Sequence, residues 1–310
     1  MSDFFTASVL IATVASGIRL ATPYLLAALG ETIGQRSGML NLGVDGIMLL
    51  GAFGAYYTVL ETESLVLGVA VGALVGLGMG VIVAFVNVTL RSEQGISGIG
   101  VYLFGLGFSD LLFQTWVGTP RSIRRFGSWD VPLLSDIPWV GEMFFQHSPA
   151  VYAAFALVPI VAFVLRRTDW GLRVKAVGED PAAADSVGVR VQGIRWSTTL
   201  IGSMFAGLAG AALAIELGIF QQNLTNGQGF IAIALVYFGA WRPLGVMGGA
   251  LLYGLVAATV LQWRTLGIIP QSASDLAAMT PAVITVVALV FVASRQRGPA
   301  ALTKAFERGG

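Results

Sequence analysis

The stretch LRVKAVGEDPAAADSVGVRV, Leu172–Val191, is polar and charged, although long apolar segments lie on both sides of it. Asp180 can cap the N-terminus of a short helix, Pro181 fits the first helical position, and Gly188 can end the helix. The alanines after the proline favour helix. The stretch therefore predicts a short helix outside the membrane, well placed to contact another subunit.

The composition around this stretch indicates a polytopic membrane protein. Of the 310 residues, 55% are hydrophobic and 11% are charged, and the mean hydropathy is +0.78. Soluble domains carry about 25% charged residues. The first apolar stretch lacks the basic region and cleavage site of a secretory signal, so we expect it to remain in the mature protein.

Apolar runs long enough to cross a hydrocarbon core of about 30 Å predict an all-α protein with about nine transmembrane or re-entrant helices in one domain, residues 1–310. The seventh run is short and flanked by glycines, which predicts either a full span or a broken helix beside protein or water. The second begins with three close glycines, which favour either a substrate path or tight helix packing. The nine runs are 4–29, 39–60, 65–90, 96–117, 150–165, 193–215, 227–241, 244–263 and 279–294.

Lys and Arg are unevenly divided between the predicted connections. If the 166–192 loop is cytoplasmic, its side carries 13 of the 18 Lys and Arg residues and the other side carries four. The positive-inside rule then predicts a cytoplasmic C-terminus and an external N-terminus. The external loop at 118–149 is either an ordered connector or a docking surface. The inner set is Arg36, Arg91, Arg166, Arg167, Arg173, Lys175, Arg190, Arg195, Arg242, Arg295, Arg297, Lys304 and Arg308.

Several kinds of chemistry lack the residues they need. The chain has no cysteine, and its one histidine, His147, falls in the predicted external loop. These features argue against thiolate or histidine metal clusters and against a His-dependent catalytic triad. No stretch matches the phosphate-binding loop G-x-x-x-x-G-K-[ST]. We therefore expect no enzyme activity, no metal and no cofactor bound by this chain, and the net charge of +1 gives no case for a nucleic-acid partner.

Four charged side chains fall within or at the ends of apolar runs, where charge is costly and function is the default interpretation. Asp110 and Glu216 lie near predicted outer ends that water can reach, and Asp45 lies among glycines nearer an inner end. Arg19 lies well inside its run. We predict that it forms a structural ion pair with Glu31 or Asp45.

Three stretches together resemble a known family. GETIGQRSGMLNLGVDGIMLLGAFGA (Gly30–Ala55) resembles the opening motif of permease subunits in prokaryotic ABC importers, in the branch for simple sugars, nucleosides and, more distantly, branched-chain amino acids. TDWGLRVKAVGEDPAAADSVGVRV (Thr168–Val191) is similar to the cytoplasmic coupling segment of that family. GQGFIAIALVYFGAWRPLGVMGGALLYG (Gly227–Gly254) resembles its late signature, in the form of the shorter permease of nucleoside and simple-sugar systems. The family often has Glu where this chain has Asp45, which leaves the contact distances of that residue open.

The resemblance implies a multi-pass permease of the prokaryotic plasma (inner) membrane, for nucleosides in preference to simple sugars. Its implied partners are an ATP-binding cassette subunit that holds ATP and Mg, a second and longer permease, an extracytoplasmic solute-binding (lipo)protein, and membrane lipid. In the family, the helix matching Asp180–Val187 fits a cleft on the ATP-binding subunit. The implied coupling residues are Gly178, Glu179, Asp180, Pro181, Ala183, Ala184 and Gly188.

Motif position implies that the translocation path is lined by Asn41, Asp45, Gln228 and Phe230, with packing or capping as the alternative role for each. Two other function classes remain open. One is an ion- or proton-coupled secondary transporter that uses Arg19 and Asp45 as its coupling pair, and the other is a membrane-embedded enzyme. The coupling stretch favours the importer, because a secondary transporter has no ATPase for it to contact.

Overall fold

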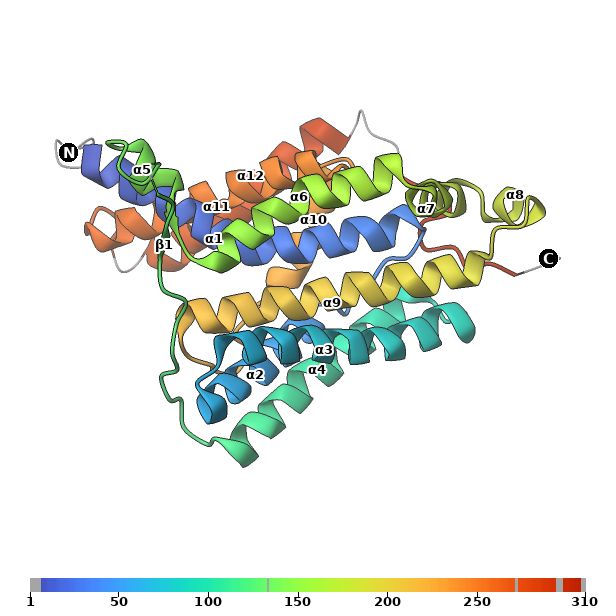
Figure 1. Ribbon diagram of the computed structural model, residues 1–310, viewed down its shortest axis with the longest axis horizontal. Coiled ribbons are helices and arrows are strands. Elements are labelled where there is room, and N and C mark those ends of the chain that lie inside the picture. Colours follow the sequence, from blue (N-terminus) through green and yellow to red (C-terminus); the bar gives the residue numbers. More distant parts are fainter. Residues whose placement is uncertain (1–6, 133, 271–272, 294–297, 308–310) are drawn as a thin grey trace.

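The computed structural model of the protein describes residues 7–132, 134–270, 273–293 and 298–307. Most of that chain is helical (Figure 1), and β1 (Trp129–Asp130) and β2 (Gln146–His147) form a short antiparallel pair. Among the described residues, six helices are long and apolar enough to cross a membrane. They are α1 (Ala7–Arg36), α3 (Leu65–Ala84) continued by the π-helix η2 (Phe85–Thr89), α4 (Gln94–Trp116), α6 (Pro149–Arg167), α9 (Val191–Leu217) and α11 (Pro243–Thr265). The chain is therefore a helical, multi-pass membrane protein.

The other predicted apolar runs also coincide with helices, which are α2 (Val44–Thr62), α10 (Gln228–Phe238) and α12 (Ser274–Ala293). These three are not among the six that suit a full crossing by length and composition, so the predicted count of nine is not confirmed. The seventh run is α10, which is as short as predicted. Residues 4–6 of the first run and residue 294 of the ninth run lie outside the described residues. Short helices in the connections are α5 (Val140–Phe144), α7 (Asp169–Glu179) and α8 (Pro181–Ser186).

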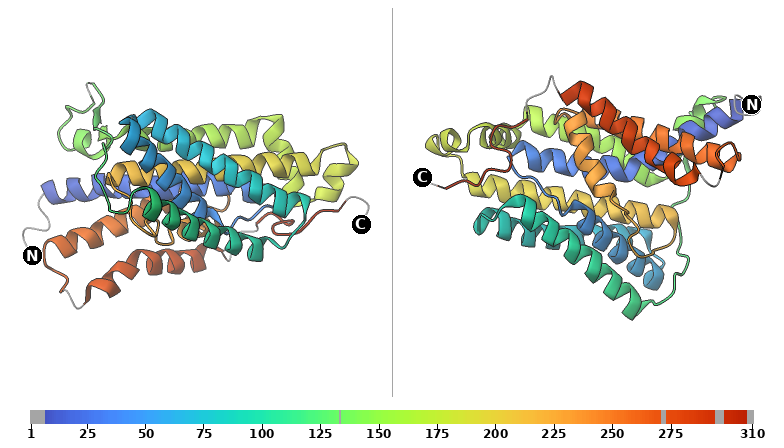
Figure 2. Two further views of the ribbon diagram at one scale, coloured as in Figure 1. Left: turned by 90° about the horizontal axis from the view of Figure 1, so that it is seen from below. Right: turned by 180° about the vertical axis from the view of Figure 1, so that it is seen from behind.

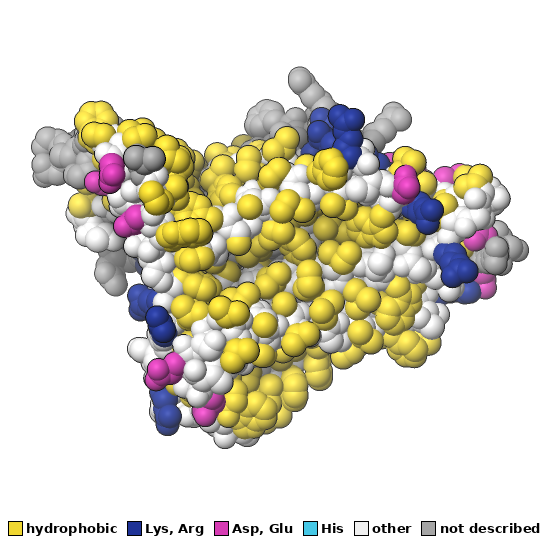
Figure 3. All heavy atoms as spheres, viewed as in Figure 1, with side chains coloured by type: hydrophobic (Ala, Val, Ile, Leu, Met, Phe, Trp, Pro, Cys, Tyr) yellow, Lys and Arg dark blue, Asp and Glu magenta, His cyan; other side chains and the backbone are white. Residues whose placement is uncertain are grey.

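The polar connections lie at opposite ends of the molecule. The start of α1 and helix α5 lie at one end, whereas α7, α8 and the tail of residues 298–307 lie at the other (Figures 1 and 2). On the face in Figure 3, charged side chains occupy both ends and hydrophobic side chains cover the middle. This arrangement agrees with the predicted separation of the 118–149 and 166–192 loops across the membrane. Arg295, Arg297 and Arg308 of the predicted inner set lie outside the described residues.

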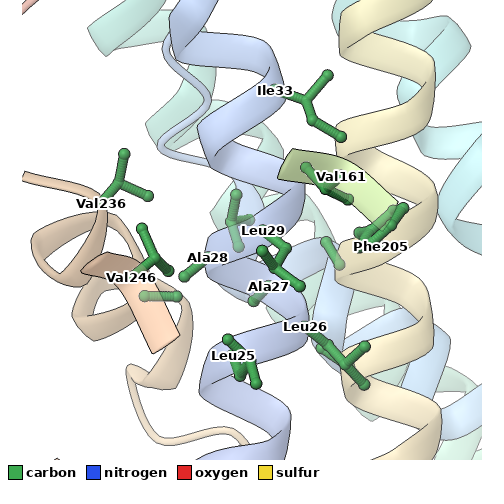
Figure 4. Packing of buried hydrophobic residues seen from close by; sticks show 14 of the residues in the cluster. Leu25, Leu26, Ala27, Ala28, Leu29, Ile33, Val161, Phe205, Val236 and Val246 are labelled. Atoms are coloured by element: carbon green, nitrogen blue, oxygen red, sulfur yellow. The ribbon is translucent and has the colours of Figure 1, made fainter. Parts of the chain in front are cut away.

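Helix α1 lies at the centre of the apolar core. Its buried residues from Leu25 to Leu29 are surrounded by Val161 of α6, Phe205 of α9, and Val236 and Val246 of α10 and α11 (Figure 4). Lipid tails are as apolar as leucine, so close packing rather than removal from water holds these helices together.

Glycines let the backbones of four helices touch. A Cβ at Gly51 of α2 would lie 2.6 Å from the Cα of Gly207 on α9, and a Cβ at Gly207 would lie 2.8 Å from the Cα of Gly76 on α3. A Cβ at Gly46 would lie 2.8 Å from the Cα of Tyr102 on α4. The glycines that begin the second predicted run therefore include one that serves close helix packing.

We expect Gly207→Ala to destabilise the protein by about 1–3 kcal/mol, because an added methyl group has no room between α9 and α3. Gly78→Ala is the matched control, since a Cβ there would have no atom of another helix within 4 Å. Thermal unfolding of both variants in detergent checks this prediction. Equal unfolding temperatures would contradict the glycine-mediated contact.

Candidate functional site

Two helices begin inside the bundle rather than at its ends. Helix α2 follows the non-helical segment 39–43, and α10 follows the non-helical segment 218–227. Asp45 of α2 lies within electrostatic reach of Tyr24, which is near the middle of α1. Gln228 of α10 lines the same cavity as Tyr24. The N-termini of both helices are therefore found at about the middle of the bundle.

The side chain of Asp45 joins these two helices. It is fully buried, and its carboxylate accepts hydrogen bonds from the Gly229 N–H at 2.7 Å and the Thr225 hydroxyl at 3.0 Å. Asp45 is in the first turn of α2 and Gly229 in the first turn of α10, so the carboxylate lies near the positive ends of both helix dipoles. A Cβ at Gly229 would lie only 2.5 Å from the Cα of Asp45. Glycine is therefore needed for this contact.

The segment 218–227 is polar and irregular. It starts at the C-terminal end of α9, where the Gly218 carbonyl accepts a hydrogen bond from the Ile123 N–H at 2.8 Å, and it ends at the start of α10. Leu224 and Thr225 are buried. Irregular backbone at membrane depth needs protein or water beside it. Figure 2 (right) shows α10 on the rear face of the molecule. The exposed polar side chains of the segment are Gln221, Gln222, Asn223 and Asn226.

The four predicted lining residues fall into two groups. Gln228 and Phe230 face open space, because Gln228 lines a cavity of about 250 Å³ and Phe230 is 38% exposed. The Phe230 ring packs edge-on against Tyr102, with centroids 5.1 Å apart. Asn41 is buried, and its Oδ1 caps the Gly43 N–H at 2.9 Å. Asn41 and Asp45 therefore have the capping role that the sequence left open as an alternative.

The structure does not bring the predicted ion pair together. Arg19 is exposed, donates to the Ser16 hydroxyl at 3.2 Å and lines the same cavity as Glu216. Within the described part of the chain, Arg91–Glu307 is the one salt bridge, so Arg19 pairs with neither Asp45 nor Glu31. The physical reason is that Thr225 and Gly229 already satisfy Asp45, whereas Arg19 lines a cavity with Glu216 near the C-terminal end of α9.

A buried polar network that the sequence did not predict links α1 to the turn before α11. The Gln35 amide donates to Glu31 at 3.2 Å and accepts from the Trp241 indole N–H at 2.8 Å. The Trp241 carbonyl accepts from Arg36 Nε at 2.9 Å. The spacing of Glu31 and Gln35, one helical turn apart, is a signal that the sequence did carry. Thr225 carried no comparable signal.

The predicted helix in the 166–192 loop is present as α8. Asp180 Oδ1 accepts the N–H groups of Ala182 and Ala183 at 3.0 and 2.9 Å, and Pro181 is the first helical residue. Gly188 has φ +87°, a conformation that favours glycine. The other predicted coupling residues lie at or beside this helix. Ala183 and Glu179 are exposed, whereas Gly178 and Ala184 are buried.

The tail of residues 298–307 holds α7 to the junction of α1 and α2. The Ala301 N–H donates to the Gly178 carbonyl at 2.9 Å, and the Thr303 N–H donates to the Gly38 carbonyl at 3.0 Å. Buried Arg195 of α9 donates to the Lys304 carbonyl at 2.9 Å. Gly178, three residues before the start of α8, is thus connected through one short segment to the chain that leads into α2.

Comparisons with known proteins agree with this architecture. A family described as the permease component of branched-chain amino acid transport systems matches residues 13–293. A putative glucose ABC transporter permease of Haloferax volcanii is 40% identical over 269 residues, covering 85% of this chain and 80% of the relative. A nucleoside ABC transporter permease of Lactococcus lactis is 32% identical over 298 residues, covering 93% and 94%. A guanosine ABC transporter permease of Bacillus subtilis is 33% identical over 298 residues, covering 91% and 92%. No solved structure matches the chain significantly.

We expect Asp45→Ala to lower the stability of the fold, because an unpaired buried donor costs about 1–3 kcal/mol and two donors lose their acceptor. Asp45→Asn should cost less, since one side-chain oxygen remains for the Gly229 N–H. Gln221→Ala, an exposed change on the same segment as Thr225, is the control. Thermal unfolding of the purified variants measures the effect. An Asp45→Ala protein as stable as the Gln221→Ala protein would contradict the joining role.

Proposed function

The chain belongs to the family of permease components of branched-chain amino acid transport systems, and on this premise we propose that its solute is a nucleoside or a simple sugar. It is a permease subunit of an ABC importer, which is a transport component and not an enzyme. Permeases named for a nucleoside, guanosine and glucose align over most of this chain, and that observation carries the substrate proposal.

The side chains exposed on segment 218–227 and at the start of α10 favour a neutral, hydroxyl-rich solute. The exposed side chains of segment 218–227 include four uncharged amides, which donate to and accept from hydroxyl groups. The exposed ring of Phe230 beside Tyr102 offers an aromatic face of the kind on which bases stack. An amino acid would bring two charges that these amides do not neutralise.

We place the translocation path along segment 218–227 and the start of α10, and we propose that a second permease subunit faces it. Lipid cannot satisfy the polar groups of this segment, so a partner chain and water must lie against it. Gln228 and Phe230 line the path in this proposal, whereas Asn41 and Asp45 shape it from behind. An ATP-binding subunit and an extracytoplasmic solute-binding protein complete the proposed importer.

We propose that α8 receives the movement of the ATP-binding subunit. Its Asp180 cap and Gly188 turn make it a rigid projection, and Val187 beside it is 80% exposed, which suits insertion into a partner's cleft. When α7 moves at Gly178, the tail transmits this displacement to Gly38 and therefore to the start of α2. Such coupling needs the two states to differ in contact energy.

Transport by the reconstituted system tests the proposed function. The chain is placed in liposomes with the ATP-binding subunit and second permease that co-purify with it, and uptake of labelled guanosine, glucose and leucine is measured with and without ATP. ATP-dependent uptake of guanosine or glucose, but not leucine, supports the proposal. Uptake driven by an ion gradient without ATP would overturn it in favour of a secondary transporter.

We expect Ala183→Arg to reduce uptake by roughly tenfold or more while ATP hydrolysis continues. A loss of this size corresponds to a typical coupling free energy between two sites. The side chain of Ala183 is exposed, so the change alters the surface of α8 without disturbing the core. Ala305→Arg adds the same charge at another exposed site of the same end and should leave uptake unchanged. Equal uptake by the Ala183→Arg and wild-type proteins would contradict coupling through α8.

We expect Ala301→Pro to lower the amount of solute imported per ATP hydrolysed, because proline lacks the N–H that donates to the Gly178 carbonyl. Loss of that hydrogen bond costs about 1 kcal/mol or more. Ala300→Pro is the matched control. The Leu302 N–H donates to the Pro299 carbonyl, which puts Ala300 at the turn position where proline is favoured and Ala301 where it is not. The ratio of solute imported to ATP hydrolysed is the readout. The same ratio in both variants would rule out transmission through the tail.

A further inference from the structure

Four basic side chains from separate elements converge at the cytoplasmic end of the bundle. We call them the inner basic cluster, and they are Arg36, Arg166, Lys175 and Arg242. We propose that this cluster binds the phosphate headgroup of an anionic phospholipid of the cytoplasmic leaflet. The inference does not depend on the transported solute, and it assigns a role to residues outside the proposed path.

Backbone contacts hold the four residues close together. Arg36 is the last residue of α1, and its Nε donates to the Trp241 carbonyl at 2.9 Å, next to Arg242. The Arg36 carbonyl packs against Gly178, which lies three residues after Lys175 on α7.

Helix α6 brings the fourth member to the same place. Arg166 is in the last turn of α6. Gly171 of α7 packs against the backbone of Leu165 in the same turn, because a Cβ added at Gly171 would lie only 2.7 Å from the Leu165 Cα. The ends of α1, α6 and α7 and the start of α11 thus form one surface.

The cluster holds four positive charges, and one acid, Glu179, acts on the Arg36 guanidinium among them. The Arg36 guanidinium lies within electrostatic reach of Arg166, Arg242 and Glu179. Partial burial, together with the nearby Arg36 and Arg166 charges, lowers the pKa of the Lys175 ammonium. Within the described residues, none of the four cations forms a salt bridge. Gathering like charges in this way is unfavourable unless an anion lies among them.

Helix boundaries place the cluster at the level of the inner headgroups. Arg36 and Arg166 are at the cytoplasmic ends of spanning helices, and Arg242 directly precedes another. Arg166 and Arg242 are exposed, whereas Arg36 and Lys175 are half-buried. Topology alone requires cations on this side, but it does not require four elements to bring them to one point. Guanidinium groups bind phosphate through paired hydrogen bonds.

Apolar side chains on the membrane side of the cluster favour a lipid over a soluble phosphate. Phe163, one turn before Arg166, is 62% exposed, and Leu244, two residues after Arg242, is 51% exposed. Acyl chains attached to a phosphate held by the cluster would lie over these side chains. A free phosphate ion would gain nothing from them.

Native mass spectrometry of the full chain in mild detergent tests the proposal. Phosphatidylglycerol and phosphatidylcholine are titrated separately into the wild-type protein and into a Lys175→Gln, Arg242→Gln variant. The control is an Arg167→Gln, Arg173→Gln variant, which removes the same charge from two exposed residues outside the cluster at the same end. Thermal unfolding verifies that all three proteins are folded.

We expect phosphatidylglycerol to bind the wild-type and control proteins alike, because the control loses no bond to the headgroup. The cluster variant should bind it roughly 100-fold more weakly, since each charge-assisted hydrogen bond to phosphate that is lost costs about tenfold. Phosphatidylcholine should bind weakly to all three. Equal losses in the cluster and control variants, or equal binding of the two lipids, would overturn the proposal. Displacement of phosphatidylglycerol by inorganic phosphate with similar affinity would identify a soluble ligand instead. Unchanged lipid binding with loss of a co-purifying ATP-binding subunit would identify a protein contact.

Discussion

Backbone polar groups inside a membrane must be satisfied by the protein, and the buried carboxylate of Asp45 meets this constraint where two helices break. Helix α10 begins at mid-depth, so its first N–H groups have no partner within the helix. Asp45 accepts one of them, and Thr225 satisfies the second carboxylate oxygen. Without this junction, segment 218–227 could not approach the middle of the bundle with its polar side chains exposed. The proposed path therefore depends on a residue that does not itself face it.

Close packing makes this junction possible. Gly229 lets α10 reach the backbone of Asp45, and Gly46 lets α4 press against the same turn of α2. On the far side of α2, Gly51 meets Gly207 of α9. The start of α2 is thus enclosed by backbone on several sides, which removes water from the carboxylate and strengthens its hydrogen bonds. A rigid junction of this kind suits a permease, because movement applied at one end would reach the proposed path without being absorbed.

The end of the bundle that holds α7 and α8 combines two kinds of surface. Helix α8 and its Val187 project away from the bundle and suit a protein partner, whereas the inner basic cluster lies level with the headgroups and suits lipid. The tail connects the two, since its contact with Gly178 lies between Lys175 of the cluster and α8. A lipid held by the cluster would steady α7 on α1 and α6, and α8 would then move together with its tail rather than independently.

Features that depend on residues close together in the chain were predictable from the sequence. The Asp180 cap, Pro181 and Gly188 define α8 because capping involves neighbours within three positions, and apolar runs locate the helices because lipid demands a minimum length. The three motifs likewise identified the family. Tertiary structure alone decided which partner each buried polar group found. Asp45 bonds with Thr225, 180 residues away, and not with Arg19. Helix rotation and depth set those pairings, and both result from packing across the whole bundle, which no local pattern records.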